Sequence, residues 1–274
     1  MKNIPFKRFS AGSAPIVSGH QICVFKESEK EHQLVSCLMV TRGNMNLIRQ
    51  SYSSFKSQTW KNRELVIVCA HVSDELRNLA ADDEREVRLV EIEDGTFTLG
   101  DLRNLSVARS QGEFICQWDD DDLYDPDRIS ISMKVLIGSS VDAVFLCRLL
   151  LWWESRGQLS ISSSRVWEGS ILARRSVIPI YPSIKKGEDS AVTDWISRYY
   201  PISVIDYPQL YCYRVTGYNT SDDKHFEKWF AHSTKVFQKD EFAAVFSLPC
   251  FNHNTIERLR KAQEELEKPV TLVK

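Results

Sequence analysis

Residues 117–126 read Gln-Trp-Asp-Asp-Asp-Asp-Leu-Tyr-Asp-Pro and place four aspartates side by side. A short apolar run, Phe114-Ile115-Cys116, leads into this stretch, and Pro126 opens a helix-like segment. Adjacent carboxylates repel one another, so a folded protein keeps them together where something positive binds. A solvated acidic turn is the alternative that a charge run alone would favour. Ligands of open α/β sheets collect at the carboxyl ends of strands, and the position after a buried strand therefore favours a ligand site.

The chemistry of the acidic run favours Mg²⁺ or Mn²⁺ shared with the phosphates of a substrate. An EF-hand loop needs alternating ligands, a glycine at its sixth position and a glutamate at its twelfth, and no register of this run supplies them. Hard carboxylate oxygens with few protein ligands suit Mg²⁺ or Mn²⁺. We therefore expect metal ligands among these aspartates.

The composition argues against several other classes of protein. With 274 residues and a net charge of -2, the chain can bury a large core and lacks the basic field of a nucleic-acid-binding protein. Its start lacks the apolar core of a secretory signal, and its longest apolar run, residues 141–153, is too short to span a bilayer. We expect a cytoplasmic protein, with peripheral contact at the inner face of the membrane left open. Scattered cysteines without a CxxC pair predict buried thiols in a reducing compartment: Cys23, Cys37, Cys69, Cys116, Cys147, Cys212 and Cys250.

Strand-like and helix-like patterns alternate in the first half of the chain. Residues 1–33 have no clear period and are expected to form an irregular extension. Apolar runs predict strands over 34–40, 64–69, 87–92 and 114–118, and helical spacing predicts helices over 47–58, 74–81 and 100–112, the last stopped by Gly112. This alternation predicts a doubly wound, mainly parallel sheet, that is, a Rossmann-like α/β fold.

The second half is less regular. After Pro126 we expect a helix to about residue 136, a strand over 143–151, a helix over 191–199, strands over 202–207 and 209–214, and terminal helices over 226–237 and 255–267. Residues 152–187 are expected to be irregular. Their aromatic side chains could stack on sugar rings or belong to the core, and both interpretations stay open for Trp152, Trp153, Trp167, Tyr181 and Pro182.

Over about residues 34–220, the chain resembles a family-2 glycosyltransferase with the A-type nucleotide-sugar (GT-A) fold. The matching segments are Val40-Thr41-Arg42-Gly43-Asn44, Gln58-Thr59-Trp60, Glu64 to Val68, Leu99 to Asn104, Gly112 to Ile115, and the Asp119-x-Asp121-Asp122 motif with Pro126. The second half adds Trp167 to Ser170, Tyr181-Pro182, Lys186-Gly187-Glu188-Asp189 and Tyr211-x-Tyr213-Arg214. Each motif alone is modest evidence, but several in the family's order are strong evidence.

The resemblance implies an inverting, metal-dependent transfer of a sugar from a nucleotide-sugar, expected to be a UDP-sugar, to a hydroxyl of a glycan or glycolipid. By family analogy, the role would be in bacterial surface polysaccharide synthesis. It also implies a division into an extension (1–33), a nucleotide-sugar-binding half (34–137), an acceptor-binding half (138–220) and a C-terminal helical extension (221–274).

By similarity, Asp121 is the main metal ligand, Asp119 binds the ribose or the metal, and Asp122 supports them. Asp189 would be the base that deprotonates the acceptor hydroxyl, with Glu188 as the next candidate. Local sequence alone would favour helix capping for these two residues, and the surrounding motif reverses that preference. A carboxylate at a helix N-terminus is kept ionised by the helix dipole and the free N–H groups.

The remaining donor contacts implied by the resemblance are Thr41, Arg42, Asn44, Cys69, Arg103, Asp120 and Arg214. Arg103 and Arg214 suit the diphosphate, although both could instead be structural salt-bridge partners. Cys69 stands where relatives carry an aspartate that reads the uracil edge. Val215-Thr216 follows Arg214 where relatives often carry a metal-binding histidine. His225 could replace that histidine from a loop, although a surface histidine is the favoured account.

Two alternatives remain open. A nucleotidyltransferase would also pair a doubly wound sheet with metal-binding acids, but it should have a Gly-rich first loop, and Thr41-Arg42-Gly43-Asn44 is poor in glycine. An inactive sugar-nucleotide-binding protein of the same fold is the non-enzyme alternative, which the presence of both the acids and the base candidate weakens.

Overall fold

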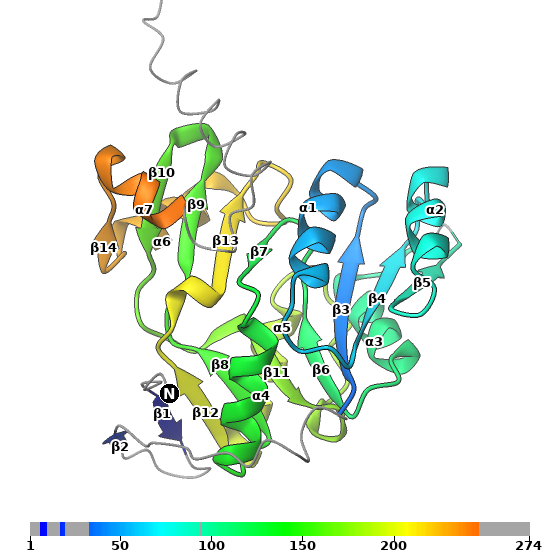
Figure 1. Cartoon of the computed structure of the whole chain (residues 1–274), viewed down its shortest axis with the longest axis horizontal. Coiled ribbons are helices and arrows are strands. Elements are labelled where there is room, and N and C mark those ends of the chain that lie inside the picture. Colours follow the sequence, from blue (N-terminus) through cyan, green and yellow to red (C-terminus); the bar gives the residue numbers. More distant parts are fainter. Residues whose placement is uncertain (1–5, 10–16, 20–32, 94, 247–274) are drawn as a thin grey trace, which may run out of the picture.

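The computed structural model describes residues 6–9, 17–19, 33–93 and 95–246 (Figure 1). The helices are α1 (Met45–Lys56), α2 (Asp74–Asp82), α3 (Leu99–Arg109), α4 (Arg128–Gly138), α5 (Glu188–Tyr199), α6 (Asp223–Ala231) and α7 (Phe242–Phe246). The strands are β1 (Phe6–Phe9), β2 (Val17–Gly19), β3 (Val35–Thr41), β4 (Arg63–Cys69), β5 (Val87–Glu91), β6 (Phe114–Gln117), β7 (Leu123–Tyr124), β8 (Ala143–Leu146), β9 (Leu150–Trp153), β10 (Gln158–Ile161), β11 (Trp167–Arg174), β12 (Ile202–Ile205), β13 (Tyr211–Val215) and β14 (Lys235–Val236).

The described strands form a larger sheet in the order β2-β1-β12-β8-β11-β6-β3-β4-β5 and a smaller one in the order β14-β10-β9-β13-β7. Strands β5, β4, β3 and β6 are mutually parallel, which confirms the predicted α/β fold for the first half. In the second half β12 pairs in parallel with β8, but β11 runs antiparallel to both β6 and β8, so the sheet is mixed there where a mainly parallel one was expected. The reason is that the chain passes from β8 into the smaller sheet, where it forms β9 and β10. It then returns to the larger sheet as β11, in the direction opposite to β8.

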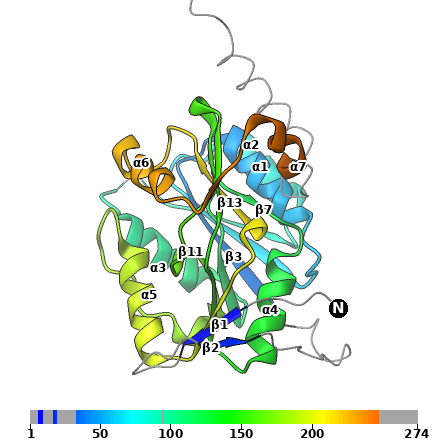
Figure 2. The same cartoon turned by 90° about the vertical axis from the view of Figure 1, so that its left-hand side faces the viewer.

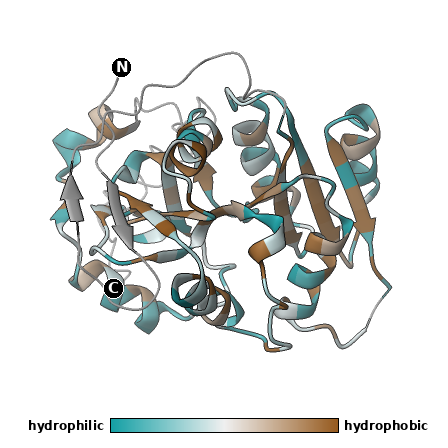
Figure 3. Ribbon diagram, turned by 90° about the horizontal axis from the view of Figure 1, so that it is seen from below, coloured by the Kyte–Doolittle hydropathy of each residue, from teal (hydrophilic) through white to brown (hydrophobic). Residues whose placement is uncertain are grey.

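Helices cover both faces of the larger sheet, and alternation along the strands explains why. On β3, Cys37 and Met39 belong to the core cluster that includes Ile48 and Phe55 of α1, whereas Leu38 packs with Val107 of α3. Seen along the sheet, α1, α2 and α4 lie on one side and α3 and α5 on the other (Figure 2). The strands between them are coloured as hydrophobic over most of their length (Figure 3), as expected for a sheet buried on both faces.

Polar residues at the helix ends fix the positions of the loops around the sheet. Asn44 caps α1, and Thr98 and Asp101 form a capping box at the start of α3. The prediction that Gly112 stops α3 is wrong, because the helix ends at Arg109. Gly112 is instead pressed against the start of β3, where an added Cβ would lie 2.6 Å from both the Leu34 carbonyl oxygen and Ser36 Oγ.

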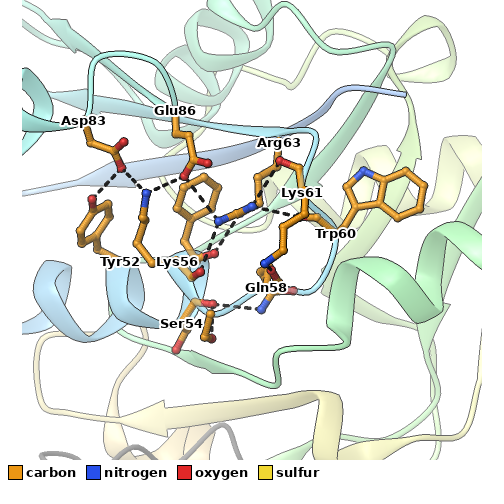
Figure 4. A network of polar contacts seen from close by, with 11 residues as sticks. Tyr52, Ser54, Lys56, Gln58, Trp60, Lys61, Arg63, Asp83 and Glu86 are labelled. Carbon is orange, nitrogen blue, oxygen red and sulfur yellow. Dashed lines mark hydrogen bonds and ion pairs between the residues drawn. The ribbon is translucent and has the colours of Figure 1, made fainter. Parts of the chain in front are cut away.

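Arg63 organises a polar network between α1, β4 and the turn before β5 (Figure 4). Its guanidinium is 3% exposed and donates to the carbonyl oxygens of Phe55 and Trp60 at 3.1 Å. Beside it, Lys56 Nζ lies 2.8 Å from Asp83 and 2.7 Å from Glu86. Each charge in this network therefore has an opposite charge or backbone acceptors.

Several predictions for the second half are wrong. The single strand expected over 143–151 is two strands in different sheets, β8 and β9, and the segment 152–187 contains β10 and β11. Helix α6 ends at Ala231, six residues before the end expected for it, and 235–236 forms β14. In the expected irregular extension, β1 and β2 pair with each other, and β1 pairs with β12. The helix predicted over 255–267 lies outside the described residues.

Among the aromatic residues left open by the sequence, Trp152, Trp153 and Tyr181 are core residues, and Trp167 packs in the core but also lines the cleft described below. Trp152, Trp153, Trp167 and Tyr181 are all buried. The cysteines within the described ranges confirm the prediction of buried free thiols, namely Cys37, Cys69, Cys116, Cys147 and Cys212. Among the described helices, none has both the length and the apolar character needed to cross a bilayer.

Candidate active site

A cleft of about 620 Å³ opens at the carboxyl ends of β3 and β6. Thr41, Arg42 and Asn44 line its first side, and the acidic turn 119–122 lines its floor. The start of α5 and the segment 218–221 close the other side. The cleft thus lies where an open α/β sheet binds its ligands, as the position of the aspartates predicted.

The parallel pairing of β3 and β6 places the acidic turn beside the end of β3. Leu38 pairs with Gln117, and the next amide, Trp118 N–H, donates to the Leu38 carbonyl oxygen at 3.1 Å. Trp118 is buried, with its ring centroid 3.9 Å from that of Tyr124. The Asp119 amide donates to the Tyr124 hydroxyl at 2.7 Å. Aromatic packing beneath the turn therefore fixes its backbone before any ligand binds.

Each aspartate of the turn has a different set of partners. Asp119 accepts from Gln117 Nε2 at 2.9 Å, Asp120 accepts from the Thr41 hydroxyl, and Asp121 accepts from Asn219 Nδ2 at 2.8 Å. Asp122 is 1% exposed. Its two oxygens accept from the Tyr211 hydroxyl at 2.6 Å and from the Arg214 amide at 2.8 Å. Asp122 thus ties the turn to β13.

Burial and mutual repulsion disfavour ionisation of these carboxyls. Burial raises the pKa of Asp120 to about 6, with the charge of Asp119 adding to the effect. Burial, followed by the charges of Asp120 and Asp119, raises the pKa of Asp121 to about 8. Burial and the charge of Asp121 raise the pKa of Asp122 well above its usual range. A bound cation would remove this cost, and hard carboxylate oxygens are the donor set that Mg²⁺ and Mn²⁺ prefer.

The four carboxylates do not converge on one point. Within the described part of the chain, no group of three or more His, Cys, Asp or Glu side chains is arranged to hold a metal ion by itself. Thr41 holds Asp120, and Tyr211 with the Arg214 amide holds both oxygens of Asp122. The residues therefore fit a cation whose coordination a phosphate ligand and water complete, as is usual for Mg²⁺.

Arg103 joins the acidic turn to the start of α5. It is 8% exposed, and its guanidinium lies 2.7 Å from Glu188 and 3.3 Å from Asp119. Glu188 is 2% exposed and is committed to this ion pair. The sequence predicted a diphosphate contact for Arg103 and a reserve base in Glu188. The geometry instead supports the alternative of a structural salt bridge, although both residues line the cleft.

Asp189 faces the cleft from the first turn of α5. Gly187 precedes the helix with a positive φ of 82° and provides no side-chain cap. Asp189 Oδ1 accepts from the Ser190 amide at 2.8 Å. The half-buried carboxylate lines the same cleft as the acidic turn. The structure therefore brings together the two groups of acids that the sequence assigned to the metal and to the base.

Two predicted donor contacts lie away from the cleft. Cys69 is 1% exposed and does not line it. Arg214 is also 1% exposed, and its side chain binds Glu154, with Nε at 2.9 Å, and Gln50. Of the two roles left open for Arg214, the structural one fits these contacts. Its guanidinium is already occupied.

Several cleft residues had no role in the sequence prediction. Asn219 binds Asp121, and at Gly169 an added Cβ would lie 3.3 Å from the Tyr211 hydroxyl, so a side chain there would narrow the cleft. His225 was expected at the surface, yet it is half-buried in the cleft wall with its ring 4.6 Å from that of Trp229. Asn219 and His225 lie in a loop and in α6, outside the matching segments, whereas Gly169 lies on β11 within a matching segment but had no role assigned to it. The others are Arg165, Glu168, Lys185, Lys186 and Tyr218.

Comparison with known proteins supports the resemblance predicted from the sequence. The model of glycosyl transferase family 2 matches residues 36–150. A search of curated proteins found no match. S. aureus TarS 1–349 superposes with a TM-score of 0.54 at 14% identity, covering 83% of this chain and 80% of that chain. The complex of TarS 1–349 with UDP-GlcNAc superposes with a TM-score of 0.54 at 13% identity, covering 84% of this chain and 71% of that chain. The complex with UDP superposes with a TM-score of 0.53 at 14% identity, covering 73% of this chain and 70% of that chain. The predicted GT-A fold is confirmed.

Proposed function

We propose that this chain, whose residues 36–150 match the model of glycosyl transferase family 2, is an inverting, metal-dependent glycosyltransferase that moves a sugar from a nucleotide-sugar to a hydroxyl of a glycan or glycolipid. The observation that carries the proposal is the cleft itself. Its floor is the acidic turn 119–122, and Asp189 faces it from a helix N-terminus. The floor of the cleft thus suits a cation with its phosphates, and the start of α5 suits a proton acceptor.

Asp119 and Asp121 are the proposed protein ligands of Mn²⁺ or Mg²⁺. All four aspartates of the turn line the cleft, but Asp122 has both oxygens occupied by Tyr211 and the Arg214 amide, and Asp120 accepts from Thr41. When bound, the cation would neutralise the charge of the donor diphosphate. Arg103 keeps Asp119 in place from behind, with its guanidinium 3.3 Å away. Asn219 fixes one oxygen of Asp121 and so orients the other.

Asp189 is the proposed general base. The acceptor oxygen attacks the anomeric carbon, the bond from that carbon to the diphosphate oxygen breaks, and the hydroxyl proton passes to the Asp189 carboxylate. Attack from the face opposite the leaving group inverts the configuration. The Ser190 amide donates to Asp189 Oδ1 at 2.8 Å and so helps to hold the carboxylate in the first turn of α5, where it lines the cleft. Glu188 is disfavoured because Arg103 already binds it.

A uridine nucleotide is the proposed donor. The reasons are the family resemblance and the UDP and UDP-GlcNAc complexes of TarS. Thr41 and Asn44 line the side of the cleft next to the acidic turn and are the candidates for contacting the nucleoside. Family analogy further suggests surface polysaccharide synthesis at the cytoplasmic side of the membrane.

A nucleotide panel tests the proposal. We expect UDP to raise the melting temperature of the full chain more than GDP, dTDP or CDP, and only with Mn²⁺ or Mg²⁺ present. Slow hydrolysis of a UDP-sugar should accompany binding. Asp121→Asn should weaken the Mn²⁺-dependent binding of UDP by at least roughly 10–100-fold, since it removes a direct ligand. Binding without hydrolysis or transfer would favour the inactive sugar-nucleotide-binding protein, and a preference for GDP would contradict the uridine donor.

A further inference from the structure

A set of basic side chains from the segments around β11, α5 and α6 lines the cleft. Arg165 comes from the loop before β11, Lys185 and Lys186 from the loop before α5, and His225 from the first turn of α6. In Figure 2, α6 lies on the same side of the molecule as α3 and α5. Three segments far apart in the sequence therefore supply basic side chains to one wall, which we call the basic wall (Arg165, Lys185, Lys186 and His225).

Arg165 is held rigidly in this wall. Its guanidinium carbon lies 3.9 Å from the ring centroid of Trp167 and 5.3 Å from that of Trp229. Glu168 binds one edge of the guanidinium at 2.9 Å. Stacking on aromatic rings fixes the plane of a guanidinium while leaving its other N–H groups free to donate. Arg165 is thus prepared to bind an anion in a set orientation.

Within the described part of the chain, the two lysines of the wall lack compensating acids, whereas the charge of Asp222 acts on His225. Among the described residues, neither Lys185 nor Lys186 forms an ion pair or a hydrogen bond, and both are exposed. Burial, followed by the charges of Lys186 and Arg165, lowers the pKa of His225. The three groups therefore lie within each other's electric field. A fold that gathers like charges around a cleft gains most when an anion occupies it.

These cations are separate from those on the donor side. The charge of Arg42 acts on Asp120, at the end of β3, whereas those of Lys186 and Arg165 act on His225. A donor diphosphate bound at the acidic turn would have the cation and Arg42 to neutralise it. The basic wall lines the cleft near Asp189, because Glu168 pairs with Arg165 at 2.9 Å and accepts from the Ser190 hydroxyl at 3.4 Å. An anion there would belong to the second substrate.

We propose that the acceptor is anionic and that Arg165, Lys186 and His225 bind its phosphate or carboxylate group next to Asp189. This inference rests on the proposed function, because it names the second substrate of the same cleft. The acceptor would present a hydroxyl to Asp189 while its anionic group is held by the basic wall. A phosphodiester-linked polymer or a uronic-acid-containing glycan has this chemistry, and a neutral glycan does not.

The proposal is tested with small probes on the full chain in the presence of saturating UDP and Mg²⁺. Ligand-observed NMR titrations compare glycerol 3-phosphate with glycerol, and glucuronate with glucose. We expect one or both charged probes to bind and the neutral partners not to. The two pairs distinguish a phosphate from a carboxylate acceptor. Equal binding of charged and neutral probes would overturn the proposal.

Charge reversal at an exposed lysine leaves the fold intact and tests the wall directly. Lys186→Glu should weaken binding of the charged probe by about tenfold, since it exchanges an attraction for a repulsion of similar size. Its affinity for UDP should change by less than about twofold. Lys134→Glu, at an exposed position of α4 outside the cleft, is the matched control and should change neither affinity. An equal loss of UDP affinity in Lys186→Glu would assign the wall to the donor and overturn the proposal.

Failure of the proposed function gives a different result. Probe binding is measured without turnover, so an inactive protein would still bind the charged probes. In that case UDP-sugar hydrolysis is absent while the Lys186→Glu effect remains. Conversely, the protein could be an active transferase that binds the charged probes no better than the neutral ones. The proposed function would then stand, and only the proposal of an anionic acceptor would be overturned.

Discussion

The Arg63 network and the acidic turn 119–122 are both clusters of charged groups, and they treat charge in opposite ways. In the network, Arg63, Lys56, Asp83 and Glu86 alternate in sign, and each finds a partner within 3.4 Å. In the turn, four carboxylates stand together, and the pKa of Asp121 rises to about 8. The network lowers the free energy of the folded chain by itself. We expect the turn to do so only when an external cation is added, as a binding site would.

The largest effect is expected at Asp189, which lies in the cleft but outside the turn. Asp189→Asn retains the shape of the side chain and can still accept from the Ser190 amide, so the fold should survive. It can no longer take a proton, and transfer should fall by about 10²–10⁴-fold. Rapid-quench or coupled assays with a saturating acceptor measure the rate, and calorimetry should give an unchanged affinity for UDP with Mn²⁺.

Near-wild-type turnover of Asp189→Asn would show that the residue is only part of the helix start. The base would then have to be sought elsewhere in the cleft. Glu168 would be examined first, because it lines the cleft and burial raises its pKa, with the charge of Asp189 contributing. Glu188 could act as the base only if Arg103 first released its carboxylate.

The comparison of the two clusters becomes sharpest when one charge is removed from each. Arg63→Met removes the donors to several backbone carbonyl oxygens and should lower the free energy of unfolding by about 3 kcal/mol. Asp121→Asn keeps an acceptor for Asn219 and relieves repulsion, so it should raise the melting temperature of the metal-free protein. Urea unfolding and thermal melts without added metal measure both.

Arg85→Met, at an exposed position two residues after Asp83, is the control and should be nearly neutral. The affinity for UDP with Mn²⁺ should survive in Arg63→Met and fall in Asp121→Asn. A lower melting temperature for Asp121→Asn would mean that the turn is stabilised by its own contacts, and the contrast between the clusters would disappear.

The first half of the fold was predictable because its information is local. Parallel strands buried on both faces read as apolar runs, as in Glu64 to Cys69, and the acids follow the last of them. The acidic motif and Asp189 were found by family spacing, and both line the cleft. The second sheet was missed because the apolar run 143–151 passes from the larger sheet to the smaller one, and Arg148 is its one polar residue. Arg148 donates to Asp206, which lies 58 positions later in the chain, and so distant a contact cannot be predicted from the local sequence.

Roles that depend on long-range partners were equally hard to predict. Arg103 and Arg214 have the chemistry of diphosphate ligands, and only their contacts with Glu188 and Glu154 show that they are occupied. His225 had the pattern of a surface residue, since its burial comes from Trp229 one turn later and from other segments. The basic wall is likewise visible only when its three segments are brought together.

The smallest expected effect is the pH dependence of the network. Burial tends to raise the pKa of Asp83, but hydrogen bonds from Lys56 and Tyr52 outweigh it, and the native pKa lies below the ordinary value of 3.8. A lowered pKa stabilises the fold above the unfolded-state pKa, and this stabilisation is lost as the pH falls through the native value. Asp83→Asn should therefore cost about 1 kcal/mol at pH 7 and progressively less below pH 4. Urea unfolding at pH 7, 5 and 3.5 measures the difference, with the exposed neighbour substituted in Asp82→Asn as the control. A difference that persists undiminished at pH 3.5 would show that Asp83 acts through packing, and that the pairing of opposite charges is not what distinguishes the network from the acidic turn.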